Sequence, residues 1–321
     1  MGEWTQTMSA GPLLGLAAAM ALFTLKTWTV QPALESVAGR LPAVPLFAIF
    51  RAKTAFPTVR IQEIGHAMKP FDISGRLALV TGSSRGLGHT LARGLAEQGA
   101  RVIVHGRSEE SVGRAVEAIR ADTGAEVLGV TFDVTDAGRV KSALNAMVAK
   151  HGTPDILINN AGLQRRAPFA EFDPDDWDAV LATNLSSAFY VSRALAAAMS
   201  ARGSGKIVNI GSVQSMLARQ TIAPYSASKG GVAMLTRGMA ADLARYNIQV
   251  NCISPGYFRT DMNAALWQDE SFNDWVEKRT PAQRWGEVEE LVGTMLFLCS
   301  DASSFVSGQN IFVDGGMTSV V

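Results

Sequence analysis

The stretch RLALVTGSSRGLG, from Arg76 to Gly88, carries the first strong signal of a fold. An apolar strand sequence runs directly into a turn with glycines at 82, 86 and 88. Such glycines allow a tight turn and a close approach of the backbone to a phosphate, and the amides of a helix beginning near Leu87 would attract the anion. The stretch therefore predicts a dinucleotide-binding strand, turn and helix. Because the glycine spacing differs from G-x-G-x-x-G, a plain strand-to-helix loop stays an alternative.

Further strand sequences follow this stretch, each separated from the next by helical sequence. They read RVIVH, EVLGVTFDV, DILINN, KIVNI, IQVNCI and NIFVD. Short apolar strands that alternate with helices predict a parallel sheet covered on both faces, with right-handed crossovers and a ligand beyond the carboxyl ends of the strands. We therefore expect a single α/β domain over residues 68–321, with a Rossmann-type, doubly wound, seven-stranded parallel sheet.

The composition favours a small-molecule partner. Of the 321 residues, 47% are hydrophobic and 18% are charged, as in globular proteins. Acidic and basic residues number 29 each, which argues against binding to nucleic acid. The two cysteines, Cys252 and Cys299, form no metal-spaced cluster, so we predict buried, reduced thiols and no metal site. A reducing, cytoplasmic location fits this.

Residues 1–67 lack the alternation of strands and helices. They contain an apolar run, Ser9 to Leu25, at the short end of the roughly 17–25 residues that cross a bilayer. No basic leading region or convincing cleavage site accompanies it, which argues against a secretory signal. We expect a non-catalytic extension that is a spurious start upstream of a natural start at Met68, a disordered segment, or a membrane-associating segment, and we favour the first. Membrane contact is expected only in the last case.

A tyrosine and a lysine in APYSASKGGVAML, Ala223 to Leu235, stand one helical turn apart. Tyr225 and Lys229 would project into the same space, with Cβ atoms roughly 5–6 Å apart. An ammonium beside a phenol favours the phenolate, which suits a group that exchanges a proton with a carbonyl or alcohol oxygen. Such pairs are common on helices, so the spacing needs context.

Five ordered motifs supply that context. They are the glycine turn, NNAG at Asn159 to Gly162, Ser212 thirteen residues before Tyr225, Lys229, and SPG at Ser254 to Gly256. Together they resemble the short-chain dehydrogenase/reductase family over about residues 71–321. Within that family, TGSSRGLG, NNAGLQRR, NIGSVQS, SPGYFRTDMNAAL and TPAQRWG look most like gluconate 5-dehydrogenases, also called 5-keto-gluconate reductases.

The resemblance implies a catalytic set of Asn184, Ser212, Tyr225 and Lys229. Tyr225 would be the general acid in reduction and the general base in oxidation, and Lys229 would lower its pKa and hold the nicotinamide ribose. Ser212 would donate to the substrate oxygen, although a serine here also suits a turn cap. Asn184 would position a water that connects Lys229 with solvent, through its backbone or its amide.

The second strand indicates which cofactor binds. An NAD-preferring site usually places an acidic residue at the end of this strand, but here Gly106 stands there, followed by Arg107. Arg107 and Arg85 could flank a 2′-phosphate, so NADP is expected over NAD, unless both arginines are ordinary surface charges. Asp133 would accept from the adenine amino group, as the resemblance implies, or cap a helix. The full set expected to bind the cofactor is Gly82, Ser84, Arg85, Gly86, Leu87, Gly88, Arg107, Asp133, Val134, Asn160, Ala161, Gly162, Tyr225, Lys229, Pro255 and Gly256.

The loop GLQRRAPF after NNAG points to the substrate. A guanidinium matches a sugar-acid carboxylate, and we select Arg166 over Arg165, with solvated loop arginines as the alternative. Arg166, Ser212 and Tyr225 are the expected substrate residues. Residues 257–285 should form mobile helices over the cofactor, and their tryptophans suit either packing or subunit contacts.

The expected activity is reversible, NADP-dependent reduction of 5-keto-D-gluconate to D-gluconate, in a homotetramer that the resemblance implies. The alternatives are a 2-deoxygluconate 3-dehydrogenase, a 3-oxoacyl-carrier-protein reductase, and an inactive dinucleotide-binding sensor or scaffold. An acyl-carrier substrate would need an apolar tunnel and a basic docking patch, and neither is evident. A sensor would not need the full catalytic set.

Overall fold

The computed structural model describes residues 69–260 and 263–321. The segment 1–67, with its apolar run, lies outside the described residues. The strands are β1 Leu77–Val80, β2 Arg101–Gly106, β3 Val127–Thr131, β4 Ile156–Asn159, β5 Gly205–Ile210, β6 Ile248–Pro255, β7 Phe258–Arg259, β8 Gly286–Glu287 and β9 Asn310–Val313. The helices are α2 Gly86–Glu97, α3 Glu109–Thr123, α4 Ala137–His151, α5 Pro174–Leu181, α6 Ser187–Arg202, α7 Ala223–Leu243, α8 Ala264–Trp267, α9 Glu270–Arg279 and α10 Glu290–Cys299.

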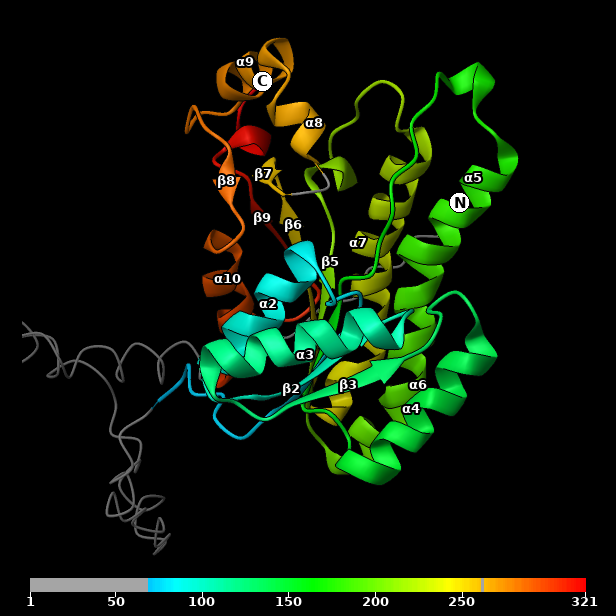
Figure 1. Cartoon of the computed structure of the whole chain (residues 1–321), viewed down its shortest axis with the longest axis vertical. Coiled ribbons are helices and arrows are strands. Elements are labelled where there is room, and N and C mark those ends of the chain that lie inside the picture. Colours follow the sequence, from blue (N-terminus) through cyan, green and yellow to red (C-terminus); the bar gives the residue numbers. More distant parts are fainter. Residues whose placement is uncertain (1–68, 261–262) are drawn as a thin grey trace, which may run out of the picture. The chain divides into compact units, whose positions relative to one another are not determined.

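Seven of these strands form one sheet in the order β3-β2-β1-β4-β5-β6-β9, and every pairing is parallel. The predicted seven-stranded, doubly wound sheet is therefore confirmed (Figure 1). The order reverses between β1 and β4, because the chain crosses from β3 back past β1 to begin β4. Ligands of such sheets bind beyond the carboxyl ends of the strands at this switch point.

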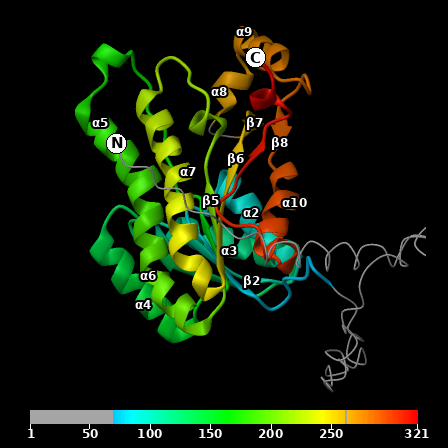
Figure 2. The ribbon, with the colours of Figure 1, turned by 180° about the vertical axis from the view of Figure 1, so that it is seen from behind.

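Helices cover both faces of the sheet, as the views from front and back show (Figures 1 and 2). Along β1 the side chains alternate: Ala78 and Val80 join one core cluster, and Leu77 and Leu79 join the other. The first cluster packs α2, α3 and α10 against the sheet, and the second packs α4, α6 and the end of α7. Both faces are therefore apolar, which explains why the strands read as nearly continuous hydrophobic runs.

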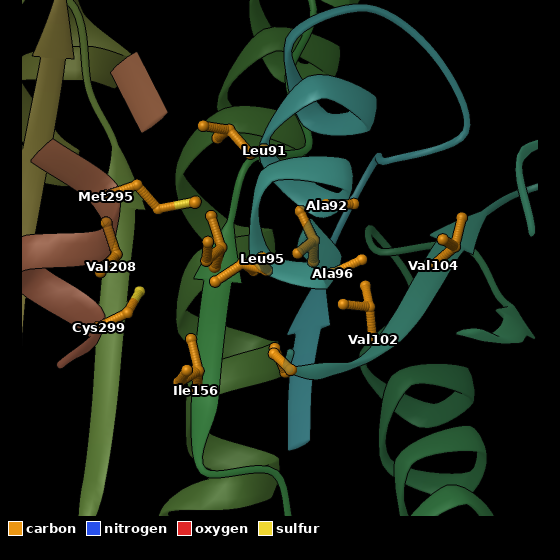
Figure 3. Packing of buried hydrophobic residues seen from close by; sticks show 14 of the residues in the cluster. Leu91, Ala92, Leu95, Ala96, Val102, Val104, Ile156, Val208, Met295 and Cys299 are labelled. Atoms are coloured by element: carbon orange, nitrogen blue, oxygen red, sulfur yellow. The ribbon is translucent and has the colours of Figure 1, made fainter. Parts of the chain in front are cut away.

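The cluster under α2 and α10 fixes the helix that follows the glycine turn. Figure 3 shows Leu91 and Leu95 of α2 and Met295 of α10 directed toward the strands that carry Ile156 and Val208. All five side chains are essentially buried. Burial of a leucine side chain contributes roughly 1.5–3 kcal/mol, so α2 is held firmly against the sheet.

Two features depart from the sequence-based picture. The helical sequence before Arg202 is interrupted by a π-helical segment, Ala182–Ser186, between α5 and α6. A separate two-stranded parallel sheet, β7 with β8, links the segment after β6 to the segment before α10. Both features lie close to residues of the candidate site.

Candidate active site

Two glycines of the phosphate turn adopt positive φ angles. Gly82 has φ +63° and Gly86 has φ +58°, a region that L side chains rarely enter. A Cβ on Gly82 would come within 2.9 Å of Ala161 Cα, whereas a Cβ on Gly86 would meet nothing within 4 Å. The turn therefore touches the end of β4 on one side and is open on the other. That open side leaves room for a phosphate to approach the backbone.

The third glycine lets α2 pack at this turn. A Cβ on Gly88 would lie 2.5 Å from the Gly82 carbonyl oxygen and would also collide with the Asn160 amide. No side chain caps the N-terminus of α2. A pyrophosphate suits this uncapped, positive helix end, so the residues present fit a dinucleotide.

His105 on β2, which sequence reasoning missed, fixes the same turn. Its Nδ1 accepts from the Gly82 amide at 3.0 Å, and its Nε2 lies 3.0 Å from the Phe132 carbonyl oxygen. Nδ1 must be unprotonated to accept, so Nε2 carries the hydrogen that is donated to Phe132. Burial lowers the pKa of His105 to about 4, which keeps the ring neutral. An imidazole directly after the apolar run Val102–Val104 was the available signal.

The predicted NNAG residues tie β4 to the turn. The Asn160 amide donates to the carbonyl oxygens of Thr81 and Gly82 at 2.9 and 3.0 Å. The backbone amides of Asn160 and Ala161 both donate to the Thr81 hydroxyl. The side chain of Asn160 thus binds the protein itself, and it supports the cofactor site by holding the turn in place.

Predicted residues at the ends of β2 and β3 lie where the adenosine part of a dinucleotide would end. Arg85 and Arg107 are exposed, and neither forms an ion pair with a described carboxylate. A Cβ on Gly106 would come within 2.9 Å of Val112, so an acidic residue does not fit there without a shift. Hydrogen bonds from the Thr135 amide and hydroxyl lower the pKa of Asp133, and the nearby Arg107 adds to this. Val134 is buried beside it.

Ser212, Tyr225 and Lys229 come together at the carboxyl end of β5. Tyr225 and Lys229 share one face of α7, and the Lys229 Nζ lies 5.6 Å from the centre of the Tyr225 ring. That Nζ donates to the Ile210 carbonyl oxygen at 2.7 Å. Ser212 caps a short helical turn by accepting from the Gln214 amide, and its hydroxyl also reaches Tyr225. The two roles considered for Ser212 are therefore compatible.

The electrostatics of this group differ from the sequence-based expectation. Burial raises the pKa of Tyr225, the hydrogen bond from Ser212 opposes this rise, and Tyr257 adds to it. Burial also lowers the pKa of Lys229 to about 8. Because the ammonium is itself desolvated and bound to Ile210, it does not lower the tyrosine pKa in the protein alone. Tyr225 is accordingly protonated at neutral pH, as a proton donor must be.

Asn184 lies in the π-helical segment and is almost fully buried. Its Oδ1 accepts from the Leu163 amide at 2.8 Å, and its Nδ2 donates to the Leu163 carbonyl and to the Ser228 hydroxyl, both at 3.0 Å. The side-chain amide is therefore fully occupied within the protein. It joins the loop after β4 to α7, where its partner Ser228 directly precedes Lys229.

Other predicted cofactor residues line the same edge of the sheet. A Cβ on Gly162 would lie 3.3 Å from the Asn184 Oδ1 and 3.9 Å from the Lys229 Nζ. Pro255 ends β6, and a Cβ on Gly256 would approach Asp314 Cα to 2.8 Å, so only glycine fits. Ser84 lies near Gly106, and Leu87 is the second residue of α2. The structure thus gathers the predicted residues around one edge.

The two loop arginines behave differently. Arg165 forms an ion pair with Asp176 at 2.9 Å, so a neighbouring carboxylate already balances its charge. Arg166 binds only the neutral Gln164 side chain among the described residues, at 3.0 Å. Burial lowers the pKa of Arg166, and the charge of Arg219 lowers it further. Sequence reasoning missed Arg219, which stands between Ser212 and Tyr225 along the chain and has no distinguishing pattern of its own.

Aromatic rings from residues 257–285 form a wall beside these arginines. The Tyr257 ring meets Phe272, Trp275 and Trp285 at centroid distances of 5.7, 5.7 and 5.6 Å. Trp285 is buried and donates to the Asn273 side chain at 2.8 Å, so this tryptophan serves packing. Figure 1 shows α8 and α9 at the top of the view, beyond the end of β6.

In residues 69–260 and 263–321, no three His, Cys, Asp or Glu side chains gather as metal ligands would. In the same part of the chain, no helix has the length and apolar character to span a bilayer.

Comparison with known proteins agrees with this geometry. A family model described as enoyl-(acyl carrier protein) reductase matches residues 82–318. Gluconate 5-dehydrogenase of Gluconobacter oxydans is 54% identical over 248 residues, which are 77% of this chain and 96% of that protein. The 5-keto-D-gluconate 5-reductase of Escherichia coli is 48% identical over 247 residues, 77% of this chain and 97% of that protein.

The solved structures give the same result. A gluconate 5-dehydrogenase from Burkholderia cenocepacia, in complex with NADP and tartrate, is 54% identical and has a TM-score of 0.78. The match covers 80% of this chain and 100% of that chain. With the parallel sheet, the glycine turn and the Ser212, Tyr225 and Lys229 group, these matches show that the chain belongs to the short-chain dehydrogenase/reductase family.

Proposed function

We propose that this protein is an NADP-dependent oxidoreductase that reversibly reduces 5-keto-D-gluconate to D-gluconate. The observation that carries the proposal is the meeting of Ser212, Tyr225 and Lys229 at one strand end, with Arg166 on the neighbouring loop. The identity of 54% to gluconate 5-dehydrogenase of Gluconobacter oxydans supports the choice of substrate. The NADP bound by the Burkholderia cenocepacia relative supports the choice of cofactor.

The residues divide the chemistry as follows. Bound NADPH would supply the hydride that reaches the ketone carbon. Tyr225 donates its phenolic proton to the carbonyl oxygen, and its raised pKa keeps that proton in place at neutral pH. Ser212 donates a hydrogen bond to the same oxygen while negative charge builds on it. In oxidation, Tyr225 takes the proton back.

Lys229 and Asn184 would serve the proton path. Lys229 would hold the ribose hydroxyls of the nicotinamide half, beside the Ile210 carbonyl that it already binds. The Asn184 side chain is occupied by Leu163 and Ser228, so its backbone carbonyl is the group we assign to the water next to Lys229. This assignment selects one of the two roles that the resemblance left open.

The substrate is tested by incubating the full chain with NADPH and a panel of ketones, with cofactor absorbance as the readout. The panel holds 5-keto-D-gluconate, the 3-keto acid of 2-deoxygluconate, and a 3-oxoacyl thioester. We expect the highest kcat/KM for 5-keto-D-gluconate and the formation of NADPH from NADP and D-gluconate. A preference for either other ketone would assign the corresponding alternative, and no turnover of any ketone would favour a dinucleotide sensor.

Tyr225→Phe tests the chemistry separately from the substrate. The variant keeps the ring beside Lys229 but lacks the proton, so turnover should fall by about 10²–10⁴-fold while NADPH binding stays unchanged. Turnover is followed by absorbance, and NADPH binding by the cofactor's fluorescence. Near-normal turnover would remove Tyr225 from its assigned role.

We also propose a cytoplasmic homotetramer. Large apolar side chains stand exposed on the outer helices, among them Phe189 of α6 and Met234 of α7, with 46% and 61% of their surfaces accessible. A second copy of the chain would cover such side chains. Size-exclusion chromatography with light scattering should give a mass of about four chains, and a monomer at micromolar concentration would contradict the proposal.

A further inference from the structure

Two cationic side chains lie on loops that meet beside the proposed reaction centre, because the Ala167 amide donates to the Thr221 carbonyl oxygen at 3.2 Å. Arg166 follows the end of β4, and Arg219 lies in the loop between Ser212 and α7. Each is near enough for the charge of Arg219 to act on the pKa of Arg166. Arginine stays protonated in proteins, so the two guanidinium groups repel each other.

Neither guanidinium is balanced by a carboxylate in the described part of the chain. Ten other arginines form ion pairs with carboxylates within 4 Å: Arg76, Arg93, Arg101, Arg114, Arg120, Arg139, Arg165, Arg202, Arg259 and Arg284. The Arg219 Nε is buried and has no hydrogen-bond partner among the described residues. An unpaired, buried donor on a charged group is costly, and that cost is relieved when an anion binds.

An aromatic ring lies next to the Arg219 guanidinium. Its guanidinium carbon lies 5.0 Å from the centre of the Phe272 ring, a stacking distance for a cation on an aromatic face. Phe272 in turn packs edge-on against Tyr257. A guanidinium presents its N–H groups in its own plane, where a carboxylate can accept two of them.

Tyr257 connects this cationic pair to the proposed reaction centre. Burial raises the pKa of Tyr257, while the charges of Arg219 and Arg166 oppose the rise. Tyr257 also acts on Tyr225, whose pKa it raises. Tyr257 is therefore coupled electrostatically both to the two arginines and to Tyr225, the acid that would protonate the ketone.

We propose that Arg219 and Arg166 together form a carboxylate site, in which the carboxylate of a polyhydroxy keto acid binds between the two guanidinium groups while its ketone lies at Ser212 and Tyr225. The inference deepens the proposed function and rests on it for the identity of the keto acid. It adds Arg219 to the substrate residues and assigns the specificity for an anionic substrate to the pair. The binding of a carboxylate stabilises both arginines and satisfies the buried Nε.

The test compares Arg219→Met, Arg166→Met and the double variant, all in the full chain. Charged hydrogen bonds contribute roughly 1.5–3 kcal/mol, so each single variant should lose about 10–100-fold in kcat/KM for 5-keto-D-gluconate. A neutral polyhydroxy ketone of the same size, 5-keto-D-fructose, should keep its kcat/KM in all variants. The KM for NADPH should also stay constant.

Arg165→Met is the matched control. It removes a neighbouring guanidinium from the same loop, but one that Asp176 already pairs. It should change kcat/KM for the keto acid less than about threefold. Arg219→Lys keeps the charge and loses the planar fork and the stacking on Phe272, so its loss should lie between wild type and Arg219→Met. Equal losses for the keto acid and the neutral ketone would overturn the proposal, as would a normal kcat/KM for the keto acid in Arg219→Met.

A binding measurement separates this inference from the proposed reaction. Calorimetry with tartrate in the presence of NADP probes the anion site even if 5-keto-D-gluconate is not a substrate. Tartrate should bind wild type and Arg165→Met and should bind Arg219→Met and Arg166→Met at least about tenfold more weakly. Tartrate binding without turnover of 5-keto-D-gluconate would refute the reaction and keep the carboxylate site, whereas equal tartrate binding by all variants, or none by wild type, would refute the site.

Discussion

A neutral imidazole at position 105 joins the phosphate turn to two strands, because it accepts from Gly82 and donates to Phe132. Its folded pKa of about 4 lies below the ordinary 6.5. Between pH 4 and pH 6.5, His105 is protonated in the unfolded chain but stays neutral in the folded chain. The contribution of His105 to the free energy of unfolding is therefore intact above pH 6.5. It is lost progressively as the pH falls toward 4, by about 3 kcal/mol in total.

Denaturant unfolding at pH 7 and pH 4.5 measures this effect. We expect wild type to lose more stability over that interval than His105→Gln, since glutamine can accept and donate at the same place without titrating. Acidic groups common to both proteins cancel in the comparison. An identical loss in the two proteins would show that His105 does not stay neutral in the folded state.

The preference for NADPH over NADH is also expected to depend on a single residue, Arg107. Arg107→Asp replaces the expected partner of the 2′-phosphate with a repelling charge, so the KM for NADPH should rise by about 10–100-fold and that for NADH far less. Arg114→Asp on α3 makes the same change in net charge at an arginine that pairs with Glu110, and it serves as the control. Equal effects on both cofactors would mean that Arg107 does not read the phosphate.

The residues that sequence reasoning found and missed differ in where their partners lie. Tyr225 and Lys229 could be found because they are four residues apart on one helix, a spacing that places two side chains on the same face. His105 and Arg219 act through Gly82, Phe132, Arg166 and Phe272, all distant in the chain. Such partnerships exist only once the sheet has formed. The pKa of Tyr225 was misjudged for the same reason, since burial by tertiary packing decides it.

At the scale of elements, the position of α2 depends on one glycine. A methyl group on Gly88 would collide with the Gly82 carbonyl and with Asn160, so Gly88→Ala must move α2 or the turn. We expect a loss of about 1–3 kcal/mol in stability and at least tenfold weaker NADP binding. Thermal melting and a cofactor titration measure these two quantities.

Gly113→Ala in α3 is the control for that change. A Cβ there meets nothing within 4 Å, and alanine favours helix over glycine by roughly 1 kcal/mol. This variant should therefore melt at the same temperature as wild type or slightly higher, with unchanged affinity for NADP. If Gly88→Ala behaved like Gly113→Ala, the close packing at the turn would not be required.

Elements differ in how well the sequence predicts them. The seven strands of the main sheet are apolar runs bounded by helical sequence, and all seven were expected in their observed order along the chain. The π-helical segment could not be expected, because the hydrogen bonds of its Asn184 side chain reach Leu163 in another loop and leave no periodic pattern in the sequence. The strands β7 and β8 have two residues each, too few for any periodic signal.

At the scale of the whole chain, every residue assigned to the site and both apolar clusters lie within residues 69–321. Ala67–Val321 also form one compact unit. We therefore propose that residues 68–321 are the catalytic domain and that residues 1–67 take no part in the chemistry.

A chain that starts at Met68 tests this division. Because every described residue of the core and of the site follows Met68, this chain should have the same melting temperature and the same kcat/KM as the full chain. If the run from Ser9 to Leu25 instead anchors the protein, the full chain should enter the membrane fraction and need detergent, while the shorter chain should not, since about 17 apolar residues barely suffice to insert. Fractionation of cells that express the natural gene, with mass spectrometry of the N-terminus, distinguishes the two cases. Peptides from residues 1–60 in the membrane fraction would establish an anchor, and a loss of activity on truncation would contradict the proposed domain boundary.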